Sequence, residues 1–188
     1  MASDRGLLPE LHNETAINVA GLLKGPTGQT REFSLSLDRF PLDDGLIAED
    51  VTGDVRLTRL RDGVMAQMTA AGTAELECAR CLQVYPQRFS VDFSEEYQQI
   101  VDVRTGFDVE LESELDEDTS RIDDNHILDI GEVLRQEIVI ALPMRPDCGD
   151  VCPGPDLDSL EGDAADEAPV DDRLAALASL LDEPEPTR

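Results

Sequence analysis

Two closely spaced pairs of cysteines constrain this chain more than any other feature of its sequence. The pairs are Cys78 with Cys81 and Cys148 with Cys152, and 66 residues lie between them. Two short loops that each supply two thiolates are the usual way to build a tetrahedral zinc site. Because a folded insertion between the pairs has no fixed length, the spacing predicts a closed zinc site with these four cysteines as ligands.

Two other interpretations of the cysteines stay open at this point. The pairs can be unconnected and bind nothing, or Cys78 and Cys81 can form a redox-active dithiol. Redox dithiols normally lie at the N-terminus of a helix, where the thiol pKa is lowered. Here the flanking segments have the pattern of strands, and Glu75 and Glu77 would raise that pKa. Four cysteines also leave no open coordination position, so we expect a structural metal rather than a catalytic one.

Alternation of apolar and polar residues predicts antiparallel strands over several segments. The pattern is clearest at 33–37, 64–78, 85–93 and 107–111. Asp62 and Gly63 predict a two-residue hairpin loop, because both residues tolerate a positive φ. Asp129, with Glu132 three residues later, resembles a capping box, and the apolar stripe that follows predicts a helix ending at about Pro143.

These elements predict an α+β fold. We expect an antiparallel β-sheet or partly open barrel, a pair of C-terminal helices and a four-cysteine zinc knuckle. The expected organisation is a flexible N-terminus over 1–15, a single α+β domain with the cysteine site over 16–153, an acidic linker over 154–170, and a C-terminal docking helix and tail over 171–188. The last helix would dock on the domain through its leucines.

The charge of the chain limits its partners. It contains 42 Asp and Glu residues against 15 Lys and Arg residues, a net charge of -27. Nonspecific binding of nucleic acid needs a basic surface, so a generic RNA clamp is excluded.

No apolar segment approaches the ~20 residues that span a bilayer, and the N-terminus lacks the apolar region of a secretory signal. We therefore expect a cytoplasmic protein with no membrane partner, in a compartment that keeps thiols reduced.

One stretch departs from this acidity, because residues 55–88 contain more Arg than Asp and Glu. Four arginines there are candidate contacts to RNA phosphates or to the carboxylates of a partner: Arg56, Arg59, Arg61 and Arg80. The alternative is pairing with carboxylates of the same chain, which exposed arginines commonly make at little energetic gain.

No catalytic pattern stands out in the sequence. It contains no Gly-rich phosphate loop with a lysine and no nucleophile elbow. The carboxylates are too numerous to single out an acid and base pair. We therefore expect a protein that is not an enzyme and has no small-molecule substrate.

Seven blocks, in order along most of the chain, carry a resemblance to a known family. They are NVAGLLKGPTGQTREF at 18–33, GDVRLTRLRDG at 53–63, ECARCL at 77–82, FSEEY at 93–97, ILDIGEVLRQEI at 127–138, LPMRPDC at 142–148 and DDRLAAL at 171–177. Together they resemble the YceD family, the large ribosomal RNA subunit accumulation proteins. The resemblance implies a role in the synthesis, processing or stability of large-subunit ribosomal RNA in bacteria and plastids.

Residue by residue, Cys78 and Cys81 match the first cysteine pair of that family, and Cys148 and Cys152 match its second cluster. Many members have one more cysteine after Cys-Pro, where this chain has Gly-Pro. We therefore expect a non-enzymatic factor in ribosome biogenesis, a zinc-stabilised binding or adaptor protein. Its expected partners are the large-subunit pre-ribosome, a basic ribosomal protein or ribosomal RNA. The alternatives are a direct RNA-binding or RNA-processing protein that uses the arginines and, third, a thiol-redox enzyme.

Overall fold

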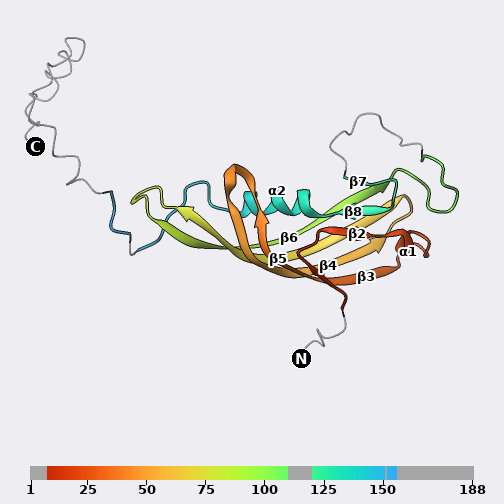
Figure 1. Cartoon of the computed structure of the whole chain (residues 1–188), viewed down its shortest axis with the longest axis horizontal. Helices are drawn as coiled ribbons and strands as arrows, with labels where there is room; N and C mark the ends of the chain where they lie inside the picture. The colour runs from red at the N-terminus through yellow and green to blue at the C-terminus, as the bar shows by residue number, and fades with distance from the viewer. Residues whose placement is uncertain (1–7, 110–119, 151, 156–188) are drawn as a thin grey trace, which may run out of the picture.

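A curled six-stranded sheet organises the computed structural model, which describes residues 8–109, 120–150 and 152–155 (Figure 1). Its strands, in spatial order, are β1 (Glu10–His12), β3 (Thr30–Pro41), β4 (Ile47–Arg59), β5 (Gly63–Glu77), β6 (Val84–Gln99) and β7 (Arg121–Ile122). The four central strands are antiparallel, whereas β1 and β7 add parallel edges. Residues 10–12, within the segment predicted to be flexible, thus pair with β3.

The core lies on one face of this sheet, under two helices and a small second sheet. Helices α1 (Ala20–Leu23) and α2 (Gly131–Ala141) cover that face together with the antiparallel pair β2 (Ala16–Asn18) and β8 (Ile127–Asp129) (Figure 1). Alternate residues over parts of the long strands are buried there, because successive side chains of a strand point to opposite faces. Among the most deeply buried residues are Leu22, Leu57, Leu128, Leu134 and Ile138.

The turn between β4 and β5 differs from the predicted two-residue loop. Arg59 pairs with Val64, and the Leu60 N–H donates to the Gly63 carbonyl at 2.9 Å, so the two loop residues are Arg61 and Asp62, one position earlier than predicted. Neither Asp62 nor Gly63 has a positive φ. The glycine is required for another reason. A Cβ on Gly63 would lie 2.1 Å from the carbonyl oxygen of Tyr97 on β6, so only a residue without a side chain allows the strands to approach here.

The prediction of a helix near 129–142 is confirmed by α2, although its capping box is only half formed. The Asp129 carboxylate accepts a hydrogen bond from the Gly131 N–H at 2.8 Å. The Glu132 side chain does not return to the cap. It pairs with Arg135, which also bonds to Asp43 in the 3-10 turn η2 (Asp43–Gly45). The β3–β4 hairpin is thereby tied to the helix.

The predicted α+β class with a C-terminal helix pair is wrong, because the described residues are mostly β and α2 is their single helix longer than one turn. Strand β4 was not predicted from alternation, because a bulge between Glu49 and Thr52 shifts its register and interrupts the pattern. The predicted strand over 107–111 is reduced, in its described part, to one bridge between Val101 and Asp108.

The second helix, predicted within 171–188, and the linker beyond residue 155 lie outside the described residues. No helix in the described part is long and apolar enough to cross a membrane.

Candidate metal centre

The four cysteines lie at one end of the long sheet, on two separate loops. Cys78 directly follows β5, and Cys81 completes the turn into β6, whereas Cys148 and Cys152 come from the segment after α2 (Figure 1). Tight backbone turns place the thiols. In the first loop the N–H of Leu82, which has a φ of 58°, donates to the Cys78 carbonyl at 2.9 Å. In the second, the N–H of Cys152 donates at 3.1 Å to a glycine carbonyl.

The sulfur atoms have the spacing of a tetrahedral metal site. All four lie within 4.8 Å of one another, with 3.8 Å between the sulfurs of Cys78 and Cys152 and 3.7 Å between those of Cys81 and Cys148. A disulfide would require about 2.05 Å. A tetrahedron with metal–sulfur bonds of about 2.3 Å places its sulfurs about 3.8 Å apart. The sequence prediction that these cysteines come together is confirmed, and the cluster can hold a metal ion.

The electrostatics of the cluster favour a cation. The backbone N–H groups of Cys81, Cys148 and Arg80 face the Cys78 sulfur and lower the pKa of that thiol to about 6, against the opposing effect of burial. Burial, followed by the neighbouring cysteines, raises the pKa of Cys148 to about 12. Once Cys78 is ionised, its charge therefore disfavours ionisation of Cys81 and Cys148. A bound cation removes this conflict, because a coordinating thiol is deprotonated outright.

Hydrogen bonds also join the two cysteine loops. The Arg80 guanidinium lies between them and donates to the Asp147 carboxylate at 2.6 Å and to the Gly149 carbonyl at 3.0 Å. The Ala79 N–H donates to the Pro146 carbonyl at 2.9 Å. The Gly149 N–H and Arg80 together lower the pKa of Asp147. The loops are thus positioned by the protein itself, which favours a preformed site.

The structure does not bring the four candidate arginines together. Arg80 belongs to the cysteine end, whereas Arg59 and Arg61 lie at the opposite end of β5. At about 3.3 Å per residue, this 15-residue strand separates them by roughly 45 Å. One surface therefore cannot include all four.

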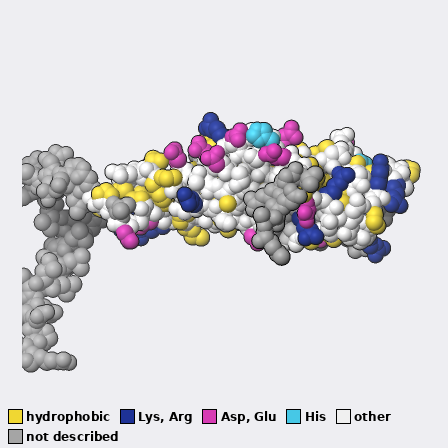
Figure 2. All heavy atoms as spheres, turned by 90° about the horizontal axis from the view of Figure 1, so that it is seen from below, with side chains coloured by type: hydrophobic (Ala, Val, Ile, Leu, Met, Phe, Trp, Pro, Cys, Tyr) yellow, Lys and Arg dark blue, Asp and Glu magenta, His cyan; other side chains and the backbone are white. Residues whose placement is uncertain are grey.

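The three remaining arginines have different environments at the other end of the sheet. Arg56 lies 3.6 Å from the Glu32 carboxylate, and Arg61 lies 3.9 Å from that of Asp62. Arg59 instead donates to two backbone carbonyls. We call this region, which consists of α1, the loop 24–29, the β4–β5 turn and residues 102–106, the arginine end. Figure 2 shows Lys and Arg side chains gathered there, on the right.

Sequence reasoning missed one cation of this region. Arg104 shares a small cavity with Arg59, although 44 residues separate them along the chain. The Asp102 carboxylate accepts hydrogen bonds from the backbone N–H groups of Arg104 and Thr105, which forms an Asx-type turn. The sequence Asp-Val-Arg-Thr-Gly at 102–106 is the local signal for that turn, but the contact with β4 is not a local property.

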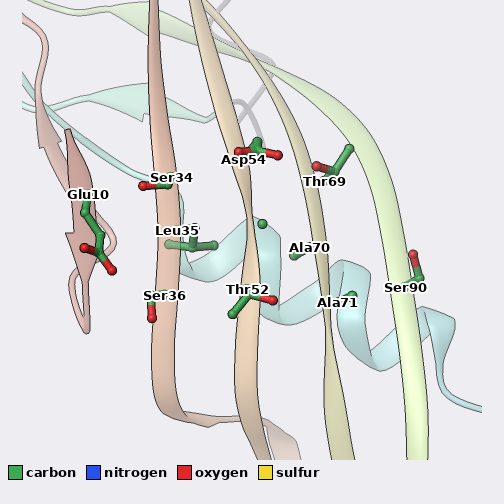
Figure 3. A pocket seen from close by; sticks show the side chains of 11 residues that line it. Glu10, Ser34, Leu35, Ser36, Thr52, Asp54, Thr69, Ala70, Ala71 and Ser90 are labelled. Atoms are coloured by element: carbon green, nitrogen blue, oxygen red, sulfur yellow. The ribbon is translucent and has the colours of Figure 1, made fainter. Parts of the chain in front are cut away.

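A hollow of about 440 Å³ lies on the sheet face that points away from α2 (Figure 3). Short side chains of four strands line it, including Ser34, Thr52, Thr69 and Ser90. Its two carboxylates, Glu10 and Asp54, have no histidine, cysteine or cation beside them in the lining. Across the described residues, the cysteine cluster is the one group of metal-binding side chains that meets the geometry of a site.

Comparison with known proteins identifies the family. The model of the family described as "Large ribosomal RNA subunit accumulation protein YceD" matches residues 66–181. No curated protein and no solved structure matches the chain. The matched residues include the four cysteines, α2 and Arg104, and they leave out β1 to β4 with Arg56, Arg59 and Arg61. This match confirms the resemblance seen in the sequence blocks. The chain belongs to the YceD family, and its role lies in the accumulation of the large ribosomal subunit.

Proposed function

We propose that this protein is a non-enzymatic factor in large-subunit ribosomal RNA accumulation that acts by binding, with a structural zinc ion at its four cysteines. The observation that carries this proposal is the spacing of the four sulfurs, which come from two segments 66 residues apart in sequence. Four thiolates form a closed set with no position for a substrate or water. The metal would therefore stabilise a binding surface and not catalyse a reaction.

Zinc is the metal that this ligand set favours. A tetrahedral set of four sulfurs suits zinc or iron, and a single zinc ion has no redox chemistry. Its ligands would be Cys78, Cys81, Cys148 and Cys152. The ion would tie the β5–β6 turn to the segment that leaves α2 and so fix the direction of the chain after the helix.

Metal analysis of the full chain, purified without added zinc, tests this proposal. We expect one zinc ion per chain and no visible absorbance from iron, because four preorganised thiolates retain zinc strongly. A matched control is Ser90→Ala, an exposed change on β6 that should keep the metal. Less than half an equivalent of zinc with free thiols intact would contradict the proposal. A reactive, metal-free Cys78 would instead support the thiol-redox enzyme.

The acidic surface supports a basic protein as the direct partner. A net charge of -27 attracts cationic surfaces and repels RNA over most of the molecule. Within the family role, the proposed partner is a basic ribosomal protein of the large-subunit precursor. Purification of the tagged protein at low salt should recover such a protein with precursor particles. Loss of every ribosomal protein from the bound material after ribonuclease treatment would contradict the protein contact.

Direct contact with RNA is a second candidate, and one observation favours it. The arginine end concentrates Lys and Arg side chains (Figure 2) on a protein whose net charge is -27. Any RNA contact is therefore proposed for that end and not for Arg80, which is engaged by Asp147 at the cysteine end.

A further inference from the structure

Two arginines at the arginine end are held by backbone carbonyls instead of carboxylates. Arg59 donates from Nη1 to the Gly63 carbonyl at 2.9 Å and from Nε to the Leu23 carbonyl at 3.3 Å. Arg104 donates from Nη2 to the Lys24 carbonyl at 3.0 Å. Within the described part of the chain, neither guanidinium has a carboxylate at ion-pair distance. Carbonyl hydrogen bonds fix the position of each guanidinium without a direct ion pair.

The two charges act on each other. Burial lowers the pKa of Arg59, Asp62 opposes this, and the smaller effects of Arg104 and Asp102 respectively lower and raise the pKa. Asp102 is the one carboxylate that lines the same cavity. Its Oδ1 already accepts three hydrogen bonds, from the Arg104 N–H and from the N–H and hydroxyl of Thr105. Asp62 and Asp102 thus oppose the two guanidiniums, and the excess of positive charge at this end comes from the exposed Lys24 and Arg61.

A cavity of about 310 Å³ makes these charges accessible. Arg59 and Arg104 line it together with Gly25, Pro26 and Thr27 of the loop after α1. The loop is short and has small or rigid residues, so a ligand can approach the two guanidiniums closely. The surroundings are polar and concave, which suits a small anionic group held by several hydrogen bonds.

Further cations extend this surface beyond the cavity. Lys24 is exposed beside it, and the side chain of Arg61 in the β4–β5 turn is 91% exposed. The guanidinium of Arg31 lies against α1, with Nη2 3.3 Å from the place that a Cβ on Gly21 would occupy. Several positive groups spaced over one end of the molecule match a chain of phosphates better than a single ion.

We propose that the cavity between Arg59 and Arg104 binds a backbone phosphate of ribosomal RNA, and that Lys24 and Arg61 contact the neighbouring phosphates. The planar guanidinium can hold two oxygens of a phosphate at once. The acidic remainder of the protein repels RNA, so the contact is confined to this end and positions the protein on the RNA without enclosing it. This inference rests on the proposed role in ribosomal RNA accumulation, but it does not depend on zinc.

Fluorescence anisotropy with a labelled single-stranded RNA oligonucleotide tests the proposal on the full chain at low salt. We expect Arg104→Gln to weaken RNA binding about tenfold and to lower the slope of affinity against salt by about 0.7, as loss of one single-strand phosphate contact predicts. The matched control is Arg88→Gln, which removes the same charge from an exposed position of β6 and should change affinity less than twofold. Arg59→Lys keeps the charge but loses the planar fork, and we expect intermediate binding.

Several results would overturn this proposal. Equal weakening of RNA binding by Arg104→Gln and Arg88→Gln would show only a general effect of charge. Absence of RNA binding by the unmodified protein would contradict the proposal directly. Binding of inorganic phosphate as tight as that of the RNA, at equal ionic strength, would assign the cavity to a free anion. Equally tight binding of a polyglutamate peptide would assign it to a protein partner. Zinc content, measured on the same samples, reports separately on the proposed metal site.

Discussion

The two ends of the β5–β6 ribbon are built in opposite ways. At the cysteine end, four thiols from two segments far apart in sequence surround the place proposed for a cation. At the arginine end, guanidiniums held by backbone carbonyls surround a place for an anion. The cysteine end extends past the core, and Leu82 and Val84 are exposed there, whereas Leu23 and Tyr97 are buried at the arginine end.

This difference indicates how each end is stabilised. Burial of apolar surface holds the arginine end, because α1 and the β2–β8 pair pack on the sheet there. At the cysteine end, Ala74 and Cys78 are the fully buried residues over positions 72–78, so hydrophobic contacts alone give little stability. The proposed metal would supply the stability that buried apolar contacts do not provide at this end. Four variants test this contrast, in order of the size of effect that we expect.

Cys148→Ser should have the largest effect, because it removes one of the four proposed ligands. Metal-coupled folding energy at such sites is on the order of 10 kcal/mol. We expect loss of zinc and selective opening of the cysteine end. Native-state hydrogen exchange should show early loss of protection at the Leu82 amide, while the Val64 amide stays protected. Equal loss of protection at both ends would contradict the proposal that the metal stabilises the cysteine end selectively.

Leu134→Ala should weaken the body that lies between the two ends. Leu134 is a fully buried residue of α2. Truncation of a buried leucine costs about 2–5 kcal/mol through lost contacts and a cavity. Ile140, which is 75% exposed on the same helix, provides the control, because Ile140→Ala should stay within about 0.5 kcal/mol. Denaturant unfolding measures both variants. Full zinc occupancy in Leu134→Ala would show that the metal site is independent of this packing.

Gly63→Ala should disturb the arginine end alone. The added Cβ would lie 2.1 Å from the Tyr97 carbonyl oxygen, so the strands must move apart. Such overpacking costs about 1–3 kcal/mol. RNA affinity should fall as well, because the Gly63 carbonyl holds Arg59. The exposed change Ser94→Ala on β6 is the control for both measurements. A melting temperature equal to that of the unmodified protein would contradict the close approach of β5 and β6.

Tyr97→Phe should have the smallest effect and the opposite sign. The Tyr97 hydroxyl is buried and has no hydrogen-bond partner within the described residues, so its removal should raise the free energy of unfolding by about 1 kcal/mol. Burial also raises the pKa of Tyr97, with Glu95 adding to it. The unfolded chain therefore ionises first, and the unmodified protein loses stability above about pH 10. Unfolding curves at neutral and high pH should diverge between the two proteins. Parallel pH profiles would contradict burial of the neutral phenol.

Local sequence patterns predicted the elements whose determinants are local. The alternation at 64–78 and 85–93 was sufficient for β5 and most of β6, and the apolar stripe after Asp129 was sufficient for α2. The same logic failed where tertiary contacts intervene. The bulge in β4 interrupts its alternation, and Phe107 is 76% exposed in a loop although its neighbours alternate like a strand. The fold class was wrong because the strands are longer than their patterns indicate.

The sequence by itself indicated which four cysteines come together, and it determined the family to which the chain belongs. Only the tertiary structure decided which arginines act together. Strand register placed Arg80 at the far end from Arg59, and the turn at 102–106 brought Arg104 to Arg59. The reason is physical. The two cysteines of a pair are separated by only two or three residues, so their sequence spacing keeps them close together. The positions of charged residues on a surface depend instead on where a 15-residue strand begins and ends.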